Sequence, residues 1–544
     1  MKKISGNIFD FSRSKFVRGT LFFDKSILMI EVDKSVVENC FVLPGLIDSH
    51  VHIESSMVSP FEYSKVAIRH GVVAAVTDPH EIANVCGVEG VRFMIEDSKR
   101  TPMKIFTGVP SCVPATQFET SGAAIGPIEI EQLFSESRCS HLSEMMNFPG
   151  VVYDDPNVLE KIELAKKYNK KIDGHAPLLK GDLLMKYISS GISTDHESVT
   201  LDEAKEKILL GMKILIRESS ASSDYDLLSD LISVYPDSVM FCTDDCHPDD
   251  LERRYIDDLF KKSILKGYPE LNVIKASSLN PIDHYGLNVG KMRSGDPSDF
   301  IVVDNLSDFH VLKTFIDGEE VFNSEEISFF DDKRVFPINN FFLNSVSLND
   351  ISVDKTLDFL NVIQVVENSL LTKRLVVSSY DSSLFWNPNI ANDILKIVVL
   401  NRYTSSKPSV GFIKGFGLKQ GAIASSFAHD SHNIVSIGVD DESILKSIDI
   451  IQQNRGGLAV VSHLFEEVLP LPIAGLMSDK PCFEVASQYS KLNNLVASLG
   501  CSLKSPFMTM SFMPLLVIPE LKIGDKGLFD VNSFNFIDLQ FSDV

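Results

Sequence analysis

One repeating pattern dominates residues 41–290 of this 544-residue chain: a short, β-branched and apolar run followed by a longer stretch with helical spacing. Eight such runs are predicted as strands, at 41–48, 72–78, 103–110, 141–146, 170–175, 191–196, 212–218 and 238–244. Eight strands alternating with helices over about 250 residues favour a closed (β/α)8 barrel over an open doubly wound sheet. The predicted fold class is therefore α/β, with a TIM-like barrel at its centre.

The barrel region is flanked by other kinds of sequence. Short alternating strands occur at residues 1–40 and again at 291–325, and neither piece is long enough to be stable alone. We therefore predict that the two pieces pair into one small composite β-domain beside the 41–290 barrel. Residues 326–544 mix helical and strand patterns and are predicted to form a separate C-terminal α/β or α+β domain.

Composition limits the partners of this chain. Its 51 Lys and Arg against 74 Asp and Glu give a net charge of −23, which disfavours nucleic-acid binding and favours a small-molecule substrate. No apolar run approaches the roughly 18 residues of a membrane span, and no apolar stretch follows the first lysines as in a secretory signal. The eight cysteines include no CxxC pair, so reduced thiols and a cytoplasmic location are predicted.

A His-x-His motif directly follows the first predicted barrel strand. His50 and His52 are two residues apart in an extended segment, so both imidazoles point the same way and can reach one metal ion. By itself the motif is a modest signal, because many such pairs are surface or core histidines.

Four further candidate ligands lie at the ends of other predicted strands. They are Glu144, His175, His196 and Asp244, at the ends of the fourth, fifth, sixth and eighth strands. Each one alone is explained as a helix cap or loop residue. In a barrel, however, these ends converge on the rim that carries the active site, and histidines with carboxylates suit two divalent cations. The pattern predicts a catalytic metal site rather than a structural one.

Several motifs together resemble the adenine deaminases of the amidohydrolase superfamily. The resemblance runs from about residue 41 to 530, and it is carried by HVHIESSM (50–57), DPHEIANVCG (78–87), EMMNFPGV (144–151), DGHAP (173–177) and AIASSFAHDSHN (422–433). The fourth-strand EMMN and the C-terminal block are not shared by the general superfamily pattern.

The resemblance implies a binuclear metal centre. It places His50, His52 and Asp244 on one ion, His175 and His196 on the other, and Glu144 as the bridge. Related amidohydrolases often bridge with a carbamylated lysine, but no lysine lies in residues 141–147. The resemblance favours Mn²⁺ or Fe²⁺, with Zn²⁺ as an alternative that ligand type alone does not exclude.

The implied reaction is the hydrolysis of adenine to hypoxanthine and ammonia. Two divalent ions make hydroxide available near neutral pH for attack on C6, and Asp244 is expected to take its proton. Glu197 and Glu81 are both candidates for the proton donor to N1. For Glu81, a solvent-facing position on a helix is an equally good interpretation.

Other polar residues are predicted around the site. Asp245 and His247 are expected to orient Asp244 or to contact the purine. Arg217 and Glu218, at the end of the seventh strand, are interpreted as a buried ion pair that shapes the pocket.

The C-terminal domain contributes a polar cluster of His429, Asp430, His432 and Asn433. Two interpretations stay open: it closes the barrel mouth of its own or a neighbouring subunit, or it is a solvated turn. The apolar segment 506–521 is either a surface for a partner or the domain's own core strand. We predict a homo-oligomer, a dimer or higher.

Two other functions are alternatives. A ring-opening amidohydrolase of the dihydropyrimidinase kind is the nearest enzyme alternative, but it calls for the bridging lysine. A catalytically inactive scaffold on the same barrel would lack ligands, whereas all six are present.

Overall fold

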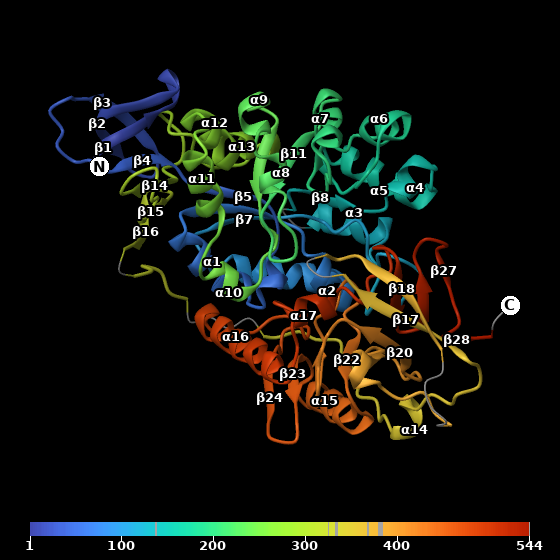
Figure 1. The fold of residues 1–544 in the computed structure, drawn as a ribbon. Helices are drawn as coiled ribbons and strands as arrows, with labels where there is room; N and C mark the ends of the chain where they lie inside the picture. The colour runs from blue at the N-terminus through green and yellow to red at the C-terminus, as the bar shows by residue number, and fades with distance from the viewer. Residues whose placement is uncertain (137–138, 325, 332–335, 367–368, 379–383, 543–544) are drawn as a thin grey trace. The chain divides into compact units, whose positions relative to one another are not determined.

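A computed structural model describes residues 1–136, 139–324, 326–331, 336–366, 369–378 and 384–542. The chain forms two compact units (Figure 1). The first unit comprises Met1–Pro79, Arg92–Cys112 and Gly126–Val335, and the second comprises His80–Val91, Val113–Ile125 and Phe336–Val544.

The first unit contains a ring of parallel strands. Its members are β5 (Leu46–His52), β6 (Val72–Thr77), β7 (Lys104–Thr107), β8 (His141–Met145), β9 (Lys171–Gly174), β10 (Thr194–Asp195), β11 (Lys213–Arg217), β12 (Val239–Cys242) and β13 (Asp244–Asp245). Parallel ladders join neighbouring strands from β5 to β7, from β8 to β9 and from β10 to β12. Parallel bridges at Val109–Leu142 and Ile172–Ile192 link these groups, and β13 returns to pair with β5. The ring is thereby closed, as the predicted barrel requires.

Helices alternate with these strands. They are α1 (Pro60–Arg69), α3 (Pro127–Glu136), α4 (Phe148–Val152), α5 (Pro156–Lys167), α6 (Gly181–Ser189), α7 (Leu201–Leu209), α8 (Tyr225–Leu228), α9 (Leu231–Val234), α10 (Pro248–Leu251), α11 (Ile256–Leu265), α12 (Glu270–Ile274) and α13 (Asn280–Tyr285). Local sequence explains their starts: at α5, the Asp155 carboxylate accepts from the backbone N–H groups of Asn157 and Val158, and Pro156 occupies the first turn. Helix α2 (His80–Ser98) contributes its first residues, through Val91, to the second unit.

The first predicted strand, 41–48, is in fact two strands. β4 (Phe41–Pro44) pairs with β1 and β14 in a separate sheet, and β5 begins the barrel after Gly45. A Cβ at Gly45 would lie 2.4 Å from Val73, so only glycine lets the backbone pass this close to β6. The dipeptide Pro44-Gly45 lies at the break and was the available sequence signal for it.

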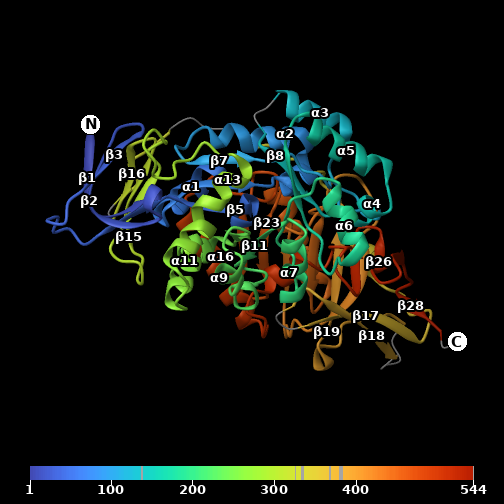
Figure 2. The same ribbon diagram turned by 90° about the horizontal axis from the view of Figure 1, so that it is seen from above.

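That separate sheet combines strands from both ends of the barrel segment. Its order is β16-β15-β14-β4-β1-β2-β3, built from β1 (Lys2–Asp10), β2 (Lys15–Phe23), β3 (Ile27–Val32), β14 (Phe300–Val303), β15 (Val311–Ile316) and β16 (Glu319–Asn323). Both ribbon views place β1–β3 beside β14–β16 (Figures 1 and 2). Phe23, Phe300 and Phe315 pack ring against ring in its core. The three-domain division stays a prediction, and its boundary at 325 lies outside the described residues.

The second unit is built on a nine-stranded sheet. Its path is β18-β17-β20-β19-β22-β21-β23-β24, with β28 also paired to β17. The strands are β17 (Phe359–Val365), β18 (Thr372–Ser378), β19 (Ile394–Leu400), β20 (Ser409–Lys414), β21 (Ala422–Ser425), β22 (Ile434–Gly438), β23 (Gly457–Val461), β24 (Glu466–Pro470) and β28 (Gln540–Phe541). Helix α15 (Asp441–Asn454) packs on β21–β23, and α16 (Cys482–Ser498) packs on β23 and β24. The remaining elements are α14 (Leu348–Ile351), α17 (Pro506–Ser511) and a small sheet of β25 (Leu521–Gly524), β26 (Gly527–Asp530) and β27 (Asn535–Phe536).

The apolar segment 506–521 is not a core strand. Residues 506–511 form helix α17, and a strand begins only at Leu521. Phe507, Met510, Met513 and Leu516 are all buried in the second unit. The segment therefore supplies core packing, as one interpretation held, but as a helix and turns, because its three prolines, Pro506, Pro514 and Pro519, cannot donate to a ladder.

Two predictions from composition concern the cysteines and membrane-spanning helices. The eight cysteines form no disulfide bond. Within the described ranges, no helix combines the length and apolar character that crossing a membrane requires.

Candidate metal centre

The six predicted ligands come together at one end of the barrel. His50 and His52 lie on β5, Glu144 on β8 and Asp244 on β13, while His175 and His196 directly follow β9 and β10. Because parallel strands of a barrel end on one rim, residues up to 194 positions apart in the sequence converge. Five of the six are at least nine-tenths buried, and the His175 side chain is 25% exposed.

Four donor groups surround a first position. The Nε2 atoms of His50 and His52 are 3.2 Å apart, and Oδ1 of Asp244 lies 3.5 Å and 3.1 Å from them. Oε1 of Glu144 lies 3.3 Å from the Nε2 atom of His52. Nitrogen and oxygen lone pairs crowded at these distances suit a cation between them.

Three donor groups also surround a second position. Oε2 of Glu144 lies 2.8 Å from Nδ1 of His175 and 3.2 Å from Nε2 of His196. Those two ring nitrogens are 3.3 Å apart. Glu144 thus presents one oxygen to each position, which is the arrangement that a bridging carboxylate needs. The donor set fits two divalent cations, because histidine and carboxylate suit the same transition metals.

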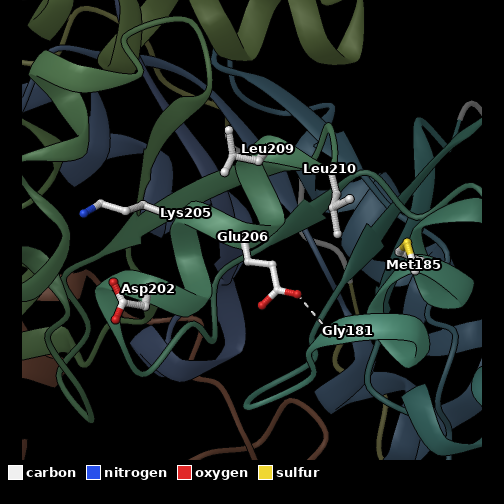
Figure 3. A pocket seen from close by; sticks show the side chains of 7 residues that line it. All are labelled: Gly181, Met185, Asp202, Lys205, Glu206, Leu209 and Leu210. Carbon is white, nitrogen blue, oxygen red and sulfur yellow. Dashed lines mark hydrogen bonds between the residues drawn. The ribbon is translucent and has the colours of Figure 1, made fainter.

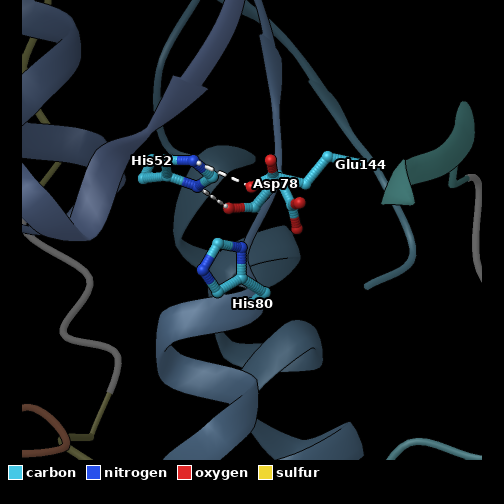
Figure 4. Close-up of side chains that lie close together, drawn as sticks. All are labelled: His52, Asp78, His80 and Glu144. Atoms are coloured by element: carbon cyan, nitrogen blue, oxygen red, sulfur yellow. Dashed lines mark hydrogen bonds and ion pairs between the residues drawn. The ribbon is translucent and has the colours of Figure 1, made fainter. Parts of the chain in front are cut away.

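The orientation of His52 is fixed by the backbone (Figure 4). Its Nδ1 lies 2.9 Å from the carbonyl oxygen of Asp78, and only a protonated Nδ1 can donate to a carbonyl. The lone pair is consequently left on Nε2, which faces Glu144 and Asp244. A backbone acceptor that fixes the tautomer in this way is typical of metal-binding histidines.

Both acidic groups of the centre stay ionised. Burial alone would raise the pKa of Glu144, but the neighbouring imidazoles of His175, His196 and His52 hold it well below its usual range. The pKa of Asp244 is likewise lowered against the effect of burial, by its contacts with His50, His52 and the Arg217 guanidinium. Two carboxylates that keep their charge while buried are the negative groups that a pair of dications requires.

The predicted Arg217–Glu218 ion pair is wrong. Arg217 instead donates to both oxygens of Glu197, to Oδ2 of Asp244 at 3.0 Å and to Asp224 at 3.0 Å. Glu218 is bound by Arg254 and Lys262. Successive side chains of β11 point to opposite faces, so neighbours in the sequence cannot pair, and Arg217 faces the barrel end. Arg217 is thus a residue of the site that sequence analysis misassigned, and its position at a strand end was the available signal.

Asp245 and His247, the other residues predicted near the eighth strand, differ in their contacts with the ligands. A carboxylate oxygen of Asp245 lies within 4.8 Å of ligand atoms of His52 and Asp244, and the Ser55 hydroxyl donates to Asp245 at 2.5 Å. His247 is buried at the start of α10, and its backbone N–H donates to Ser220. The geometry supports a role for Asp245 in orienting the ligands, whereas a role for His247 stays a prediction.

The predicted C-terminal cluster is buried, so it is not a solvated turn. In the second unit, Nδ1 of His429 lies 2.6 Å from Oε1 of Glu81, and Nε2 of His432 lies 2.5 Å from Oε2. The backbone N–H of Ala428 donates to Nδ1 of His432, so the proton of this imidazole is on Nε2 and is donated to Glu81. His429, Asp430, His432 and Glu81 are each at most 3% exposed. The solvent-facing helix position, the other interpretation of Glu81, is therefore wrong.

The charge of Glu81 follows from these contacts. Burial alone would raise its pKa, but the imidazoles of His429, His80 and His432 hold it well below the usual range. Burial lowers the pKa of His432 to about 4, so this ring is neutral near pH 7. Glu81 is an ionised carboxylate that accepts from two imidazoles.

A further buried acid, Glu119, was not predicted. Burial and the nearby carboxylates of Asp430 and Asp525 raise its pKa to about 8, and the Thr116 hydroxyl donates to it. Between about pH 4.5 and pH 8 the folded chain thus holds a proton that the unfolded chain releases, and stability falls as the pH rises through this window.

Replacing Glu119 with Gln should remove this slope, because the amide is neutral at every pH. The unfolding free energy of the variant relative to the parent is expected to grow by a few kcal/mol, about 1.4 per pH unit at most, from about pH 5 to pH 8. Urea unfolding across this range measures it, with the exposed Glu442→Gln as the matched control. A difference that stays flat for both variants would contradict the buried, protonated state of Glu119.

Family models and curated relatives both identify this chain as similar to adenine deaminases. The amidohydrolase family model matches residues 41–321, and the model of the adenine deaminase C-terminal domain matches residues 369–535. An adenine deaminase of Sulfurovum sp. is 50% identical over 499 residues, covering 92% of each chain. Adenine deaminases of Methanosarcina mazei and Borreliella burgdorferi are 48% and 44% identical, covering 99% and 98% of this chain and 99% of each relative. The chain belongs to the adenine deaminase family of amidohydrolases.

Proposed function

We propose that this protein hydrolyses adenine to hypoxanthine and ammonia at the centre formed by His50, His52, Glu144, His175, His196 and Asp244. The observation that carries the proposal is the pair of donor sets joined by the two oxygens of Glu144. The glutamate bridge disfavours the dihydropyrimidinase-like alternative, which calls for a lysine, and the complete ligand set disfavours an inactive scaffold.

Two divalent ions would be held in these positions, Mn²⁺ or Fe²⁺ in preference to Zn²⁺. When bound, such ions supply hydroxide near neutral pH and Lewis acidity. Elemental analysis of protein expressed with added manganese tests both stoichiometry and identity. About two ions per chain are expected, and fewer than one in active protein would remove the binuclear mechanism.

Asp244 is proposed to accept the proton of the attacking water. Its Oδ1 faces His50 and His52, whereas its Oδ2 is anchored by Arg217 at 3.0 Å. The guanidinium fixes the carboxylate plane so that Oδ1 alone is directed at the reacting groups. From there the proton can pass to the departing amine as ammonia leaves.

The proton donor to N1 of adenine is proposed to be Glu81 rather than Glu197. Both oxygens of Glu197 accept from Arg217, and a guanidinium does not release a proton that Glu197 could pass on. Glu81 is ionised in the structure, so it must take up a proton before it can give one to N1, and the two imidazoles from which it accepts can relay that proton from water. In this proposal His429 and His432 support Glu81, while Asp430, Asp245 and His247 help to shape the substrate site.

Substitution of the two glutamates tests this assignment. Glu81→Gln is expected to lower kcat by about 100-fold or more, the usual contribution of a positioned acid or base. Glu197→Gln should act mainly by loosening Arg217 and Asp244, with a loss of roughly tenfold, by analogy with residues that support a ligand. Steady-state kinetics at saturating metal measure both. A larger loss for Glu197→Gln than for Glu81→Gln would reverse the roles.

The substrate itself is tested with a panel of adenine, adenosine, guanine, cytosine and dihydrouracil. Adenine is expected to be deaminated and adenosine is not, because a ribose on N9 would have to fit in a site proposed for the free base. Loss of the adenine absorbance band measures turnover. Equal rates with adenosine would contradict the proposed specificity, and turnover of dihydrouracil would favour the ring-opening alternative.

The homo-oligomeric state, a dimer or higher, and the cytoplasmic location also stay proposals. Light scattering after size exclusion tests the first, and cell fractionation tests the second.

A further inference from the structure

The turn that carries His175 has an unusual backbone. It comprises residues 175–181 between β9 and α6, and both Leu178 and Gly181 adopt positive φ angles, 62° and 61°. A leucine in the left-handed region is strained, so this conformation persists only where the surroundings enforce it. His175 is also the most exposed of the six proposed ligands.

Helix α7 supplies the enforcing contacts. Lys207 donates to the carbonyl of Ala176 at 2.8 Å, and Glu203 accepts from the N–H of Leu178 at 2.8 Å. One turn further along the helix face, Glu206 accepts from the N–H of Gly181 at 2.9 Å (Figure 3). Residues 203, 206 and 207 share one face of the helix, so a single rigid element holds the turn at three points.

The same helix also holds the turn that carries His196. Asp195, the residue before this ligand, accepts from Lys207 at 2.8 Å through Oδ2. Its Oδ1 accepts from the N–H of Ala176 at 2.9 Å, which ties the two ligand turns together. Glu203 adds a contact to the N–H of Val199 at 3.3 Å.

These contacts form a closed charged network inside the protein. Lys207, Asp195 and Glu203 are each 0% exposed, and Lys207 lies 2.8 Å from both carboxylates. Buried ion pairs are weak stabilisers, because desolvation cancels most of their attraction and apolar residues often replace them without loss. Here these ion pairs fix positions, because the backbone groups that they bind lie next to His175 and His196.

We infer that α7, through Lys207, Glu203 and Asp195, is the positioning element of the second metal position. This inference rests on the proposed metal role of His175 and His196. Lys207, Glu203 and Asp195 act by fixing the two imidazoles relative to Glu144. The ligands that belong to the first position alone, His50, His52 and Asp244 on β5 and β13, take no part in these contacts with α7.

Metal titration of the full-length protein tests the inference. Chelator-treated parent protein should bind two Mn²⁺ ions per chain in calorimetry, checked by elemental analysis after dialysis. Lys207→Met is expected to weaken the binding of one of the two Mn²⁺ ions by about 10–100-fold, the usual cost of losing a residue that supports ligands. The affinity for the other ion should not change. At saturating Mn²⁺ its kcat should return to within about threefold of the parent, as expected for a positioning role.

Lys104→Met is the matched control. Lys104 binds the buried Asp299 at 2.8 Å in the same unit but contacts no residue next to a proposed ligand. This variant should lower the melting temperature and leave both Mn²⁺ affinities unchanged. If Lys207→Met does not fold, Glu203→Gln, which keeps the volume and one acceptor, should show the same selective loss.

The outcomes distinguish a failure of the proposed metal centre from a failure of the role assigned to α7. A parent that binds fewer than two ions would refute the proposed metal centre itself. A parent with two ions, together with folded Lys207→Met or Glu203→Gln protein that binds both as tightly, would overturn the role of α7. An equal loss in Lys104→Met would also overturn it, since the effect would then reflect general stability.

Discussion

Glu144→Gln is expected to reduce the metal content from about two ions per chain to one or fewer and to lower kcat/KM for adenine by at least about 1000-fold. Removing a residue that only supports a ligand already costs 10–100-fold, and Glu144 is the one group that faces both positions. An amide has one good acceptor and no charge, so it cannot bridge two cations.

The measurement pairs elemental analysis with adenine turnover in the same preparation. Glu163→Gln, an exposed substitution on α5 in the same unit, is the control for purification and handling and should keep both values. Retention of two ions and a near-normal rate by Glu144→Gln would mean that Glu144 is not the bridge. The melting temperature of the chelated variant should stay close to that of the chelated parent, which separates lost metal binding from misfolding.

The candidate ligands were predictable because barrel topology converts sequence position into spatial position. A polar residue at the end of a parallel strand must lie on the rim, whichever strand it follows. His50, Glu144 and Asp244 were found in this way, without knowledge of any contact between them. Their joint role as two sets around one carboxylate came from the family resemblance, and the distances around Glu144 now support it.

The partner of Arg217 could not be predicted in this way. Sequence adjacency suggested Glu218, but the choice among Glu197, Asp224 and Asp244 depends on which side chains point inward from three different segments. The same limit applies to Lys207, whose sequence context is that of an ordinary exposed helical lysine although it is fully buried. A charged residue in a polar helix carries no periodic signal for burial when its partners are charged as well.

The division of the chain into two compact units could not be predicted from sequence patterns either. Residues 80–91 and 113–125 have the helical and loop patterns of barrel connections, yet they pack with the C-terminal unit. Glu81 illustrates the consequence, because its two histidine partners lie about 350 residues further along the chain. Only the three-dimensional fold could show which acid pairs with the cluster in residues 429–433.

Asp244→Asn is expected to retain about two ions per chain and to lower kcat by roughly 100- to 10,000-fold, the range for loss of a general base. The carboxylate is one of several ligands at the first position, where His50, His52 and Glu144 remain, so metal binding should survive. The amide cannot accept a proton from water, so the chemical step should fail. In Asp244, Oδ2 contacts Arg217 and Oδ1 contacts the nitrogen of His52. The NH₂ group of the asparagine takes the place of one of these two oxygens, so it must face either Arg217 or the histidine nitrogens.

Asp224→Asn provides the matched comparison for this substitution. Asp224 accepts from the same guanidinium at 3.0 Å but contacts no proposed ligand, so its loss should cost less than about tenfold in kcat. Stopped-assay kinetics at saturating adenine, with metal analysis of each sample, distinguish the possibilities. If Asp244→Asn loses an ion and recovers its rate with excess Mn²⁺, Asp244 is only a ligand. If it keeps both ions and turns over slowly at every metal concentration, the missing function is proton transfer, because the cations remain and only the acceptor has changed.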